Sequence, residues 1–340
     1  MSPAPGSASP EQGEREAPFD RSRGAVAVTG ATGFIGGHVA RLLARRGLQV
    51  LALHRRASEP PATDGIRWTT IETWETSGAA VDALIHVAAV RHRHGVPPEE
   101  YGRQNVALTR RLLSSAKGRV GRFVDISSIA VFGWPETLPI DDGFPFRPVG
   151  PYGRSKVETE ALVRGSGIPY AIVRPSITYG PGDTNGMIDK LFRLVTAGRY
   201  RLVGPGRSRV QLVYVEDLAH AIAEAALREG LAGAEFTCTY RDPISMRDLS
   251  ESAARALGKR LPSRAVPLPV ARLAAFGFEA LDALRFPFPG GEPPVTREKL
   301  LTVTVDRCYD IRRMREALRW EPPTGYEEGL RRTAVAFAPG

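Results

Sequence analysis

Three glycines near the N-terminus constrain the fold of this chain more than any other feature. Gly30, Gly33 and Gly36 recur at three-residue intervals between an apolar segment, residues 24–29, and a segment at 34–46 whose apolar side chains share one side. A strand, a glycine-rich turn and a helix in this order are typical of a dinucleotide-binding site. The first glycine allows the tight turn, the second lets the backbone approach the pyrophosphate, and the third lets the helix pack on the strand. Because the helix N-terminus also stabilises negative charge, we expect this turn to bind a nicotinamide cofactor.

Apolar runs separated by helix-length stretches continue after the turn. The runs lie at 49–53, 81–89, 122–126, 170–173 and 210–215. Strands that alternate with helices predict a parallel sheet covered by helices on both faces. The expected fold is therefore α/β, with a Rossmann-type doubly wound parallel sheet.

Glycine- and proline-rich breaks begin at about Tyr179 and indicate a second, smaller lobe. A chain of 340 residues is long enough for one large α/β domain with such a lobe attached. We expect residues 24–178 and about 208–238 to form the dinucleotide-binding domain. A mixed α/β substrate lobe is expected from 179–207 and about 239–340, and a disordered tail from the Pro-, Ser-, Gly- and Glu-rich residues 1–23.

Composition excludes several classes of function. The net charge of +9 comes mainly from arginines that are scattered among acids, which argues against a nucleic-acid surface. Cys238 and Cys308 are the only cysteines and lie far apart, so no structural metal site is expected. The N-terminal segment lacks the apolar core of a signal peptide or membrane span. We expect a cytoplasmic protein without stable membrane insertion.

The end of the second expected strand favours one nicotinamide cofactor over the other. In dinucleotide folds a carboxylate at this place accepts hydrogen bonds from the adenine ribose and favours NAD. This chain has His54, Arg55 and Arg56 there instead. Two guanidinium groups suit a ribose 2′-phosphate, so we expect NADP(H). NAD(H) is the alternative if these arginines are only solvated surface residues.

A tyrosine and a lysine four residues apart, Tyr152 and Lys156, follow the turn-forming residues 148–151. On a helix this spacing places both side chains on one face. A neighbouring ammonium group favours the phenolate and lowers a pKa that is ordinarily about 10, so the pair suits general acid–base chemistry. The chain has only five lysines, which makes a chance lysine here uncommon. The ammonium group can also donate to the ribose of the cofactor.

Two serines, Ser127 and Ser128, end the expected strand at 122–126. Ligands of open α/β sheets bind at the carboxyl ends of the strands. We expect Ser128 to hold the substrate oxygen beside Tyr152 and to polarise a carbonyl as hydride arrives. Ser127 as the active hydroxyl, or two serines that only cap the strand, are the alternatives.

The chain resembles the extended short-chain dehydrogenase/reductase family from about Ala25 to the C-terminus. The motifs that carry the resemblance occur in order: Thr29 to Gly36, His86 to Ala89, Asn105-Val106, Ser127-Ser128 with Val131-Phe132-Gly133, Tyr152 to Lys156, and Arg174 to Gly182. By this resemblance Ser128, Tyr152 and Lys156 form a catalytic triad. With the arginines above, the expected cofactor contacts are Gly30, Thr32, Gly33, Phe34, Ile35, Gly36, Arg55, Arg56, Ala88, Ala89, Asn105, Tyr152, Lys156, Pro175, Ser176 and Ile177. Asn105 has the alternative role of tying a helix to the sheet, and the family often forms homodimers.

Departures from the family patterns separate its branches. Dehydratases of this family carry an Asp-Glu pair after the catalytic Ser or Thr, where this chain has Ile129-Ala130. Epimerases present a diphosphate-binding arginine before paired acids; Arg209 is close, but Val210 occupies that register. Residues 173–176 and the C-terminal lobe resemble the branch of dihydroflavonol-reductase-like and 3β-hydroxysteroid-dehydrogenase-like enzymes.

The expected activity is NADP(H)-dependent hydride transfer between the nicotinamide and a carbonyl or alcohol of a small or medium organic substrate. Tyr152 exchanges the proton, Ser128 positions the oxygen, and Lys156 tunes the tyrosine. A nucleotide-sugar epimerase that uses NAD and a non-catalytic dinucleotide sensor are the rival hypotheses.

Two further segments have open roles. The basic loop Arg91–His94 either binds an acidic group or is simply solvated. The apolar stretch 270–288 is interrupted by charges and is unsuited to span a bilayer, so we expect it to pack as core and pocket wall rather than to contact a membrane.

Overall fold

The structure is a computed structural model that describes residues 24–55, 65–91, 95–262, 264–285, 287–288 and 292–337. The predicted tail at 1–23, Arg56 and His92–His94 lie outside the described residues. Seven strands, all parallel, form the main sheet in the order β10-β6-β5-β4-β1-β2-β3. Their bounds are β1 (Ala25–Thr29), β2 (Gln49–His54), β3 (Ile66–Thr70), β4 (Val81–His86), β5 (Val120–Ile126), β6 (Tyr170–Pro175) and β10 (Ala234–Cys238). The doubly wound α/β prediction is confirmed.

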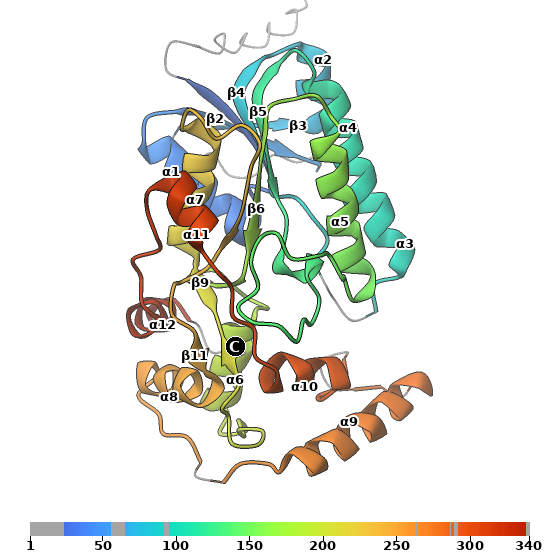
Figure 1. Cartoon of the computed structure of the whole chain (residues 1–340), viewed down its shortest axis with the longest axis vertical. Helices are drawn as coiled ribbons and strands as arrows, with labels where there is room; N and C mark the ends of the chain where they lie inside the picture. Colours follow the sequence, from blue (N-terminus) through green and yellow to red (C-terminus); the bar gives the residue numbers. More distant parts are fainter. Residues whose placement is uncertain are drawn as a thin grey trace, which may run out of the picture.

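Helices cover both faces of this sheet (Figure 1). One face packs against α1 (Phe34–Arg45), α7 (Val215–Leu227) and α11 (Arg312–Leu318). The other packs against α2 (Ile71–Ser77), α4 (Ala107–Ala116) and α5 (Gly150–Arg164). Alternate residues of each strand supply the two cores: Val26 and Val28 of β1 enter the first, Ala25 and Ala27 the second. Short helical segments lie between these elements: α3 (Pro98–Tyr101), the π-helical η2 (Gly102–Val106) and the 3-10 turn η3 (Ile129–Val131).

A smaller mixed α/β lobe lies below the sheet (Figure 1). It contains two short strand pairs, β7 (Ile177–Tyr179) with β9 (Leu212–Tyr214) and β8 (Arg209–Val210) with β11 (Ile244–Ser245). Its helices are α6 (Met187–Thr196), α8 (Met246–Ala256), α9 (Leu268–Ala283), α10 (Arg297–Thr304) and α12 (Tyr326–Val335). Among the described residues, no helix is both long and apolar enough to cross a membrane.

Three details differ from the expected organisation. The run at 210–215 does not join the main sheet, because β9 pairs with β7, and the outer strand of the sheet is β10 instead. Helix α11 packs on the main sheet although it follows the second lobe in sequence, since Met314 and Leu318 are buried in the first core. The expectation that 270–288 packs as core and pocket wall is wrong for α9, of which only Ala271 and Ala275 are buried. An apolar sequence shows that a helix face is hydrophobic, but it does not show which part of the protein, if any, covers that face.

Candidate functional site

The predicted site residues follow the carboxyl ends of five strands. Gly30 follows β1, Arg55 follows β2, Ala88 and Ala89 come after β4, and Ser128 after β5, while Pro175–Ile177 lie at the end of β6. Because every strand of this sheet is parallel, all these residues lie along one edge. Strands β1 and β4 are neighbours, and the chain turns to opposite sides of the sheet from them. Such a switch point is where open α/β sheets bind their ligands.

The glycine turn has the geometry that a pyrophosphate needs. Gly30 has a positive φ of 72°, and a Cβ there would lie 2.9 Å from the backbone nitrogen of Ala88. A Cβ on Gly36 would overlap the carbonyl oxygen of Gly30, so only glycine lets α1 pack this closely on the turn. Gly33 is the N-cap of α1, where no side chain caps the helix and no acidic residue occupies the first turn. These features leave a helix N-terminus open to a phosphate group.

The other turn residues lie at the surface beside this helix end. Thr32 and Gly33 are exposed, and Phe34 and Ile35 are half-buried. Thus the turn and the first residues of α1 are the parts of this chain that fit the pyrophosphate of a dinucleotide.

The end of β2 carries a buried histidine and an exposed arginine. His54 packs edge-on against Trp68 with ring centroids 6.2 Å apart, and its ring nitrogens have no hydrogen-bond partner among the described residues. Arg55 is exposed, and its Nη1 donates to Oε1 of Gln104 at 3.0 Å. The guanidinium group is therefore held at the edge where the adenine ribose lies in dinucleotide folds.

A chain of hydrogen bonds leads away from the glycine turn through a buried histidine. The backbone N–H of Ala88 donates to Oγ1 of Thr29 (3.2 Å), which pairs with Nδ1 of His86 (2.9 Å). On the other side of the ring, Nε2 pairs with Oγ1 of Thr109 (3.0 Å), which donates to the carbonyl oxygen of Asn105 (2.9 Å). Burial lowers the pKa of His86 to about 3, so the ring is neutral. Because the Thr109 hydroxyl donates its one proton to Asn105, it must accept from the ring. The ring therefore donates from Nε2 to Thr109 and accepts from Thr29 at Nδ1.

Asn105, in the π-helical segment η2, extends this series of hydrogen bonds to helix α5. Its side chain accepts from the backbone N–H of Val90 (2.7 Å) and donates to the Val90 carbonyl (3.1 Å) and to Oγ of Ser155 (3.1 Å). Ser155 in turn donates to the carbonyl oxygen of Tyr152 (2.8 Å). Both amide protons are thus used within the protein, which favours the tie between helix and sheet over a direct cofactor contact.

The environments of the two serines after β5 differ. Ser127 is buried, and its hydroxyl donates to Oε1 of Glu160 at 2.6 Å. Ser128 is half-buried, and its Oγ accepts from the backbone N–H of Ala130 at 3.2 Å. An accepting hydroxyl keeps its own proton for another partner. The geometry therefore favours Ser128 over Ser127 as the hydroxyl offered to a substrate.

Helix α5 brings Tyr152 and Lys156 to the end of β5. Lys156 is buried, and its Nζ donates to the carbonyl oxygen of Ile126 at 2.7 Å. Tyr152 is half-buried, with its ring 6.3 Å from the ring of Tyr101. A Cβ on Gly153 would lie 2.8 Å from the carbonyl oxygen of Ala130, so the first turn of α5 packs directly on the turn that follows Ser128. The predicted catalytic residues thus lie where α5 meets the end of β5.

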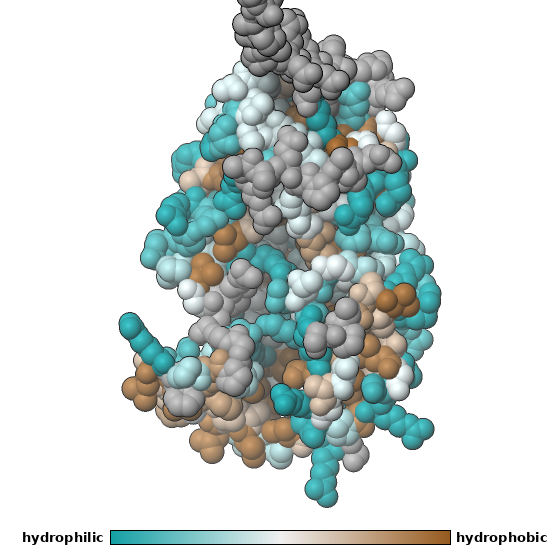
Figure 2. Space-filling view, turned by 180° about the vertical axis from the view of Figure 1, so that it is seen from behind, coloured by the Kyte–Doolittle hydropathy of each residue, from teal (hydrophilic) through white to brown (hydrophobic). Residues whose placement is uncertain are grey.

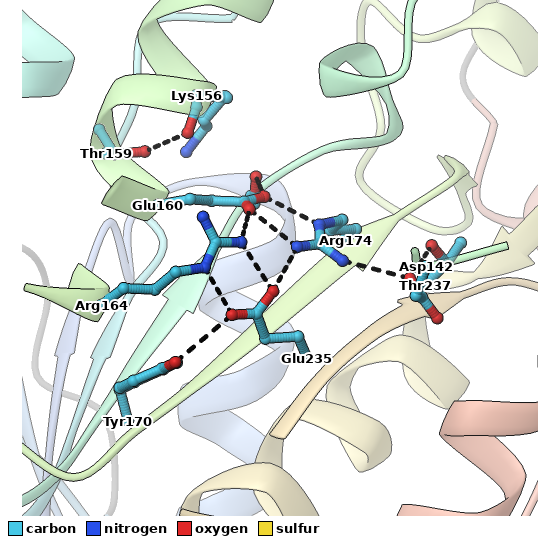
Figure 3. Close-up of polar contacts among 10 residues, drawn as sticks. Asp142, Lys156, Thr159, Glu160, Arg164, Tyr170, Arg174, Glu235 and Thr237 are labelled. Carbon is cyan, nitrogen blue, oxygen red and sulfur yellow. Dashed lines mark hydrogen bonds and ion pairs between the residues drawn. The ribbon is translucent and has the colours of Figure 1, made fainter. Parts of the chain in front are cut away.

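A buried ionic network behind this meeting point was not predicted (Figure 3). Arg174 of β6 is fully buried and binds both carboxylate oxygens of Glu160, at 2.9 and 2.8 Å. It also binds Glu235 at 2.7 Å and Asp142 at 3.3 Å. Arg164 joins Glu160 and Glu235 from the other side at 2.6 to 2.7 Å. Burial raises the pKa of Asp142, the carboxyl at the far end of the network.

This network connects the elements that carry the site. Glu160 lies one turn after Lys156 on α5 and accepts from Ser127, the neighbour of Ser128, while Arg174 precedes Pro175 on β6. A guanidinium that binds two carboxylates in fixed geometry holds its partners at a set distance. The network therefore fixes α5, β5 and β6 relative to one another. The one sequence signal for it was a charged residue, Arg174, directly after the expected strand 170–173.

The remaining predicted residues have defined surroundings. The hydroxyl of Ser176 donates to Oγ1 of Thr239 at 2.8 Å, and Ile177 is half-buried at the start of β7. Ala88 and Ala89 are half-buried. Among the described residues, no group of three or more His, Cys, Asp or Glu side chains is arranged to hold a metal ion.

Comparisons with known proteins agree with this geometry. Residues 26–237 match the profile of the NAD dependent epimerase/dehydratase family. A 2-alkyl-3-oxoalkanoate reductase from Stenotrophomonas maltophilia is 28% identical over 333 residues, which cover 92% of this chain and 99% of the relative. A 3 beta-hydroxysteroid dehydrogenase/Delta 5→4-isomerase from Mycobacterium tuberculosis is 30% identical over 328 residues, 88% of this chain and 86% of the relative.

A solved structure shows the same fold. The UDP-glucuronic acid 4-epimerase from Bacillus cereus, in complex with NAD, superposes with a TM-score of 0.72 at 18% identity over 92% of this chain and 96% of that one. The profile match spans more than half of the sequence and includes the glycine turn, Ser128, Tyr152 and Lys156. The chain therefore belongs to the NAD dependent epimerase/dehydratase family and is an enzyme of the short-chain dehydrogenase/reductase type.

Proposed function

We propose that this enzyme is an NADP(H)-dependent ketoreductase or alcohol dehydrogenase that works by a Ser-Tyr-Lys mechanism. The observation that carries the proposal is the meeting of α5 with the end of β5, on the same edge of the sheet as the glycine turn. There Lys156 binds the Ile126 carbonyl, the turn after Ser128 contacts Gly153, and the hydroxyl of Ser128 keeps its proton.

Each residue of the triad has one task in this proposal. When bound, the nicotinamide supplies or accepts the hydride at the substrate carbon. Ser128 donates a hydrogen bond to the substrate oxygen and polarises the carbonyl. Tyr152 gives the proton that converts the nascent alkoxide to an alcohol. Lys156 has two N–H groups beyond the one on Ile126, which suit the cofactor ribose and the electrostatic stabilisation of a tyrosinate.

The names of the relatives support a ketone as substrate. One is a 2-alkyl-3-oxoalkanoate reductase, another a 3 beta-hydroxysteroid dehydrogenase/isomerase, and a third a ketoreductase acting on a farnesyl dihydroquinoline oxide. All three names describe a carbonyl or alcohol on a largely apolar molecule. We propose the same chemistry, at a carbonyl of a small or medium organic substrate, for this chain.

The preference for NADP(H) rests on Arg55. Its guanidinium lies exposed at the end of β2, and its bond to Gln104 uses one of five donors. A charge-assisted hydrogen bond to a 2′-phosphate contributes roughly 1.5–3 kcal/mol, which corresponds to about a 10- to 100-fold gain in affinity. Arg55→Ala should therefore weaken NADPH by about that factor and leave NADH nearly unchanged.

Nucleotide-sugar epimerisation is the second candidate, because solved neighbours of similar fold are UDP-sugar epimerases in complex with NAD. The residue at the position of the epimerases' diphosphate-binding arginine argues against epimerisation. Val210 is fully buried there, and Arg209 is exposed and paired with Asp306 at 3.5 Å. The two activities differ in stoichiometry, since an epimerase regenerates its cofactor in each cycle and a reductase consumes it.

One experiment separates these candidates. NADPH and NADH are titrated against the purified protein by nicotinamide fluorescence, and a panel of ketones is then followed by loss of NADPH absorbance. The reductase proposal expects tighter NADPH binding and one NADPH oxidised per ketone reduced. Arg55→Ala should lose the preference, while Arg199→Ala, which removes an exposed arginine outside the site, should keep it. Copurified NAD with no net cofactor consumption would instead identify an epimerase.

A further inference from the structure

Helix α9 presents an apolar face that no described part of the protein covers. The exposed fractions are 55% for Val270, 73% for Leu273, 65% for Phe276, 39% for Leu281 and 80% for Leu284, which follows the helix directly. In Figure 1 α9 projects from the lower lobe, and Figure 2 shows hydrophobic residues gathered at this end of the molecule. Contiguous exposed apolar surface of this kind marks an interaction site.

These side chains form one stripe along the helix. At 100° per residue, the apolar residues fall within roughly 140° of the helix circumference. The stripe consists of Pro269, Val270, Leu273, Phe276, Gly277, Ala280, Leu281 and Leu284, and no polar residue interrupts it. The opposite side, with Ala271 and Ala275, packs on the lobe beside α10. The stripe is therefore continuous over the whole length of α9.

Positive charge borders the stripe. Arg272 is exposed on the helix at one side of the stripe, and exposed Arg285 directly follows Leu284 at the end of the stripe. Exposed Lys259, Arg260 and Arg264 lie on the segment that leads into α9 along the lower edge of the lobe (Figure 1). Both acidic residues of α9 lie outside the stripe, and Glu279 is paired with Arg297 at 2.6 Å. An apolar stripe bordered by arginines is typical of a helix that lies in a membrane interface.

A second copy of this chain fits the stripe less well than a lipid surface does. In a symmetric dimer the same patch faces itself, so the bordering arginines of the two copies would meet. The chain also carries a net charge of +9, which opposes self-association and favours an anionic surface. One helix of 16 residues is about 24 Å long, which is too short to span a bilayer. At a width of about 10 Å, one face of this helix offers about 240 Å², less than the roughly 800 Å² per partner of a stable dimer interface.

We propose that α9 binds the surface of an anionic lipid bilayer, with its apolar stripe in the headgroup region and the bordering arginines at the lipid phosphates. Binding of this kind is peripheral and leaves the rest of the lower lobe at the membrane surface. It would place the enzyme where apolar carbonyl compounds concentrate. The proposal does not depend on the catalytic assignment, because its test reads membrane binding alone.

The test is co-sedimentation of the full-length protein with vesicles. Vesicles of phosphatidylcholine alone are compared with vesicles that also contain phosphatidylglycerol, at low and high salt. The wild type should bind the anionic vesicles more tightly, and salt should weaken that binding. Leu273→Glu with Phe276→Glu should lower the partition coefficient at least tenfold, because both side chains then resist burial. The matched control, Val335→Glu, changes an 81% exposed apolar residue on α12 and should bind like the wild type.

A second pair of variants tests the charge. Arg272→Gln with Arg285→Gln should reduce binding to anionic vesicles by about fivefold for each arginine and leave binding to neutral vesicles unchanged. The proposal is overturned if the wild type does not sediment with anionic vesicles, or if the glutamate pair binds as the wild type does. It is also overturned if light scattering shows a wild-type dimer that the glutamate pair converts to a monomer, since a second copy would then cover the stripe.

Discussion

Asp125 gives a prediction whose magnitude follows directly from its surroundings. This β5 residue is fully buried, and neither carboxylate oxygen has a hydrogen-bond partner among the described residues. Burial raises the pKa of Asp125 from its ordinary 3.8 to about 6, with the charge of Lys156 opposing the shift and that of Glu160 adding to it. The folded protein therefore holds a proton that the unfolded chain releases at lower pH.

The sign and size of the effect on stability follow from this difference. Between pH 3.8 and 6 the folded state binds the extra proton, so the free energy of unfolding falls as the pH rises. One pKa unit corresponds to about 1.4 kcal/mol, so the full loss is about 3 kcal/mol and is complete above about pH 7. Asp125→Asn keeps the shape of the side chain and removes the titration. Its stability relative to the wild type should improve by about 2 kcal/mol between pH 4.5 and 7.5.

The assay is urea unfolding followed by tryptophan fluorescence at both pH values. At each pH, the unfolding free energy of the wild type is subtracted from that of Asp125→Asn, and the two differences are compared. Any cost of burying the amide is the same at both pH values and therefore cancels in this comparison. Asp141→Asn, which removes an exposed carboxylate, is the matched control. A stability difference that stays the same at the two pH values would refute the reasoning.

Two further substitutions test the turn and the ionic network. Gly36→Ala would push a methyl group into the Gly30 carbonyl, so we expect dinucleotide affinity to fall at least tenfold in a fluorescence titration, whereas Gly277→Ala, with open space around its Cα, should retain full affinity. Arg174→Met leaves buried Asp142 without a guanidinium partner and buried Glu160 with that of Arg164 alone, and should cost about 3–5 kcal/mol of unfolding free energy in urea. A loss below about 1 kcal/mol would mean that the network is not needed to hold α5 and β6 together.

Local chemistry explains why the glycine turn and the sheet were predictable. A positive φ at Gly30 and the close approach at Gly36 require glycine, so the spacing of these residues carries the geometry of the turn. The first residues of α5 are a similar case, because helical spacing places Tyr152 and Lys156 on one face. The sequence favours Ser128 over Ser127 without excluding Ser127, and the hydrogen bond from Ser127 to Glu160 supports the choice of Ser128.

Contacts between residues far apart in sequence were not predictable. The carboxylate partners of Arg174 lie 14, 32 and 61 residues away in the sequence. No local sequence pattern predicts that these residues come together. Strand β3 was missed because residues 66–70 mix polar and apolar side chains at the edge of the sheet. The 270–288 stretch was expected to be covered because it is apolar, yet packing depends on what the rest of the chain brings to it.

The most direct test of the central claim is the substitution Tyr152→Phe, measured for cofactor binding and for turnover with a ketone found active in the panel. The substitution removes one oxygen from a half-buried residue outside the turn that receives the pyrophosphate. We expect the NADPH dissociation constant to stay within about twofold and kcat to fall by about 10²- to 10⁴-fold, the contribution of a general acid. If Tyr152→Phe reduces the ketone at the wild-type rate, Tyr152 is not the proton donor and the proposed mechanism is wrong.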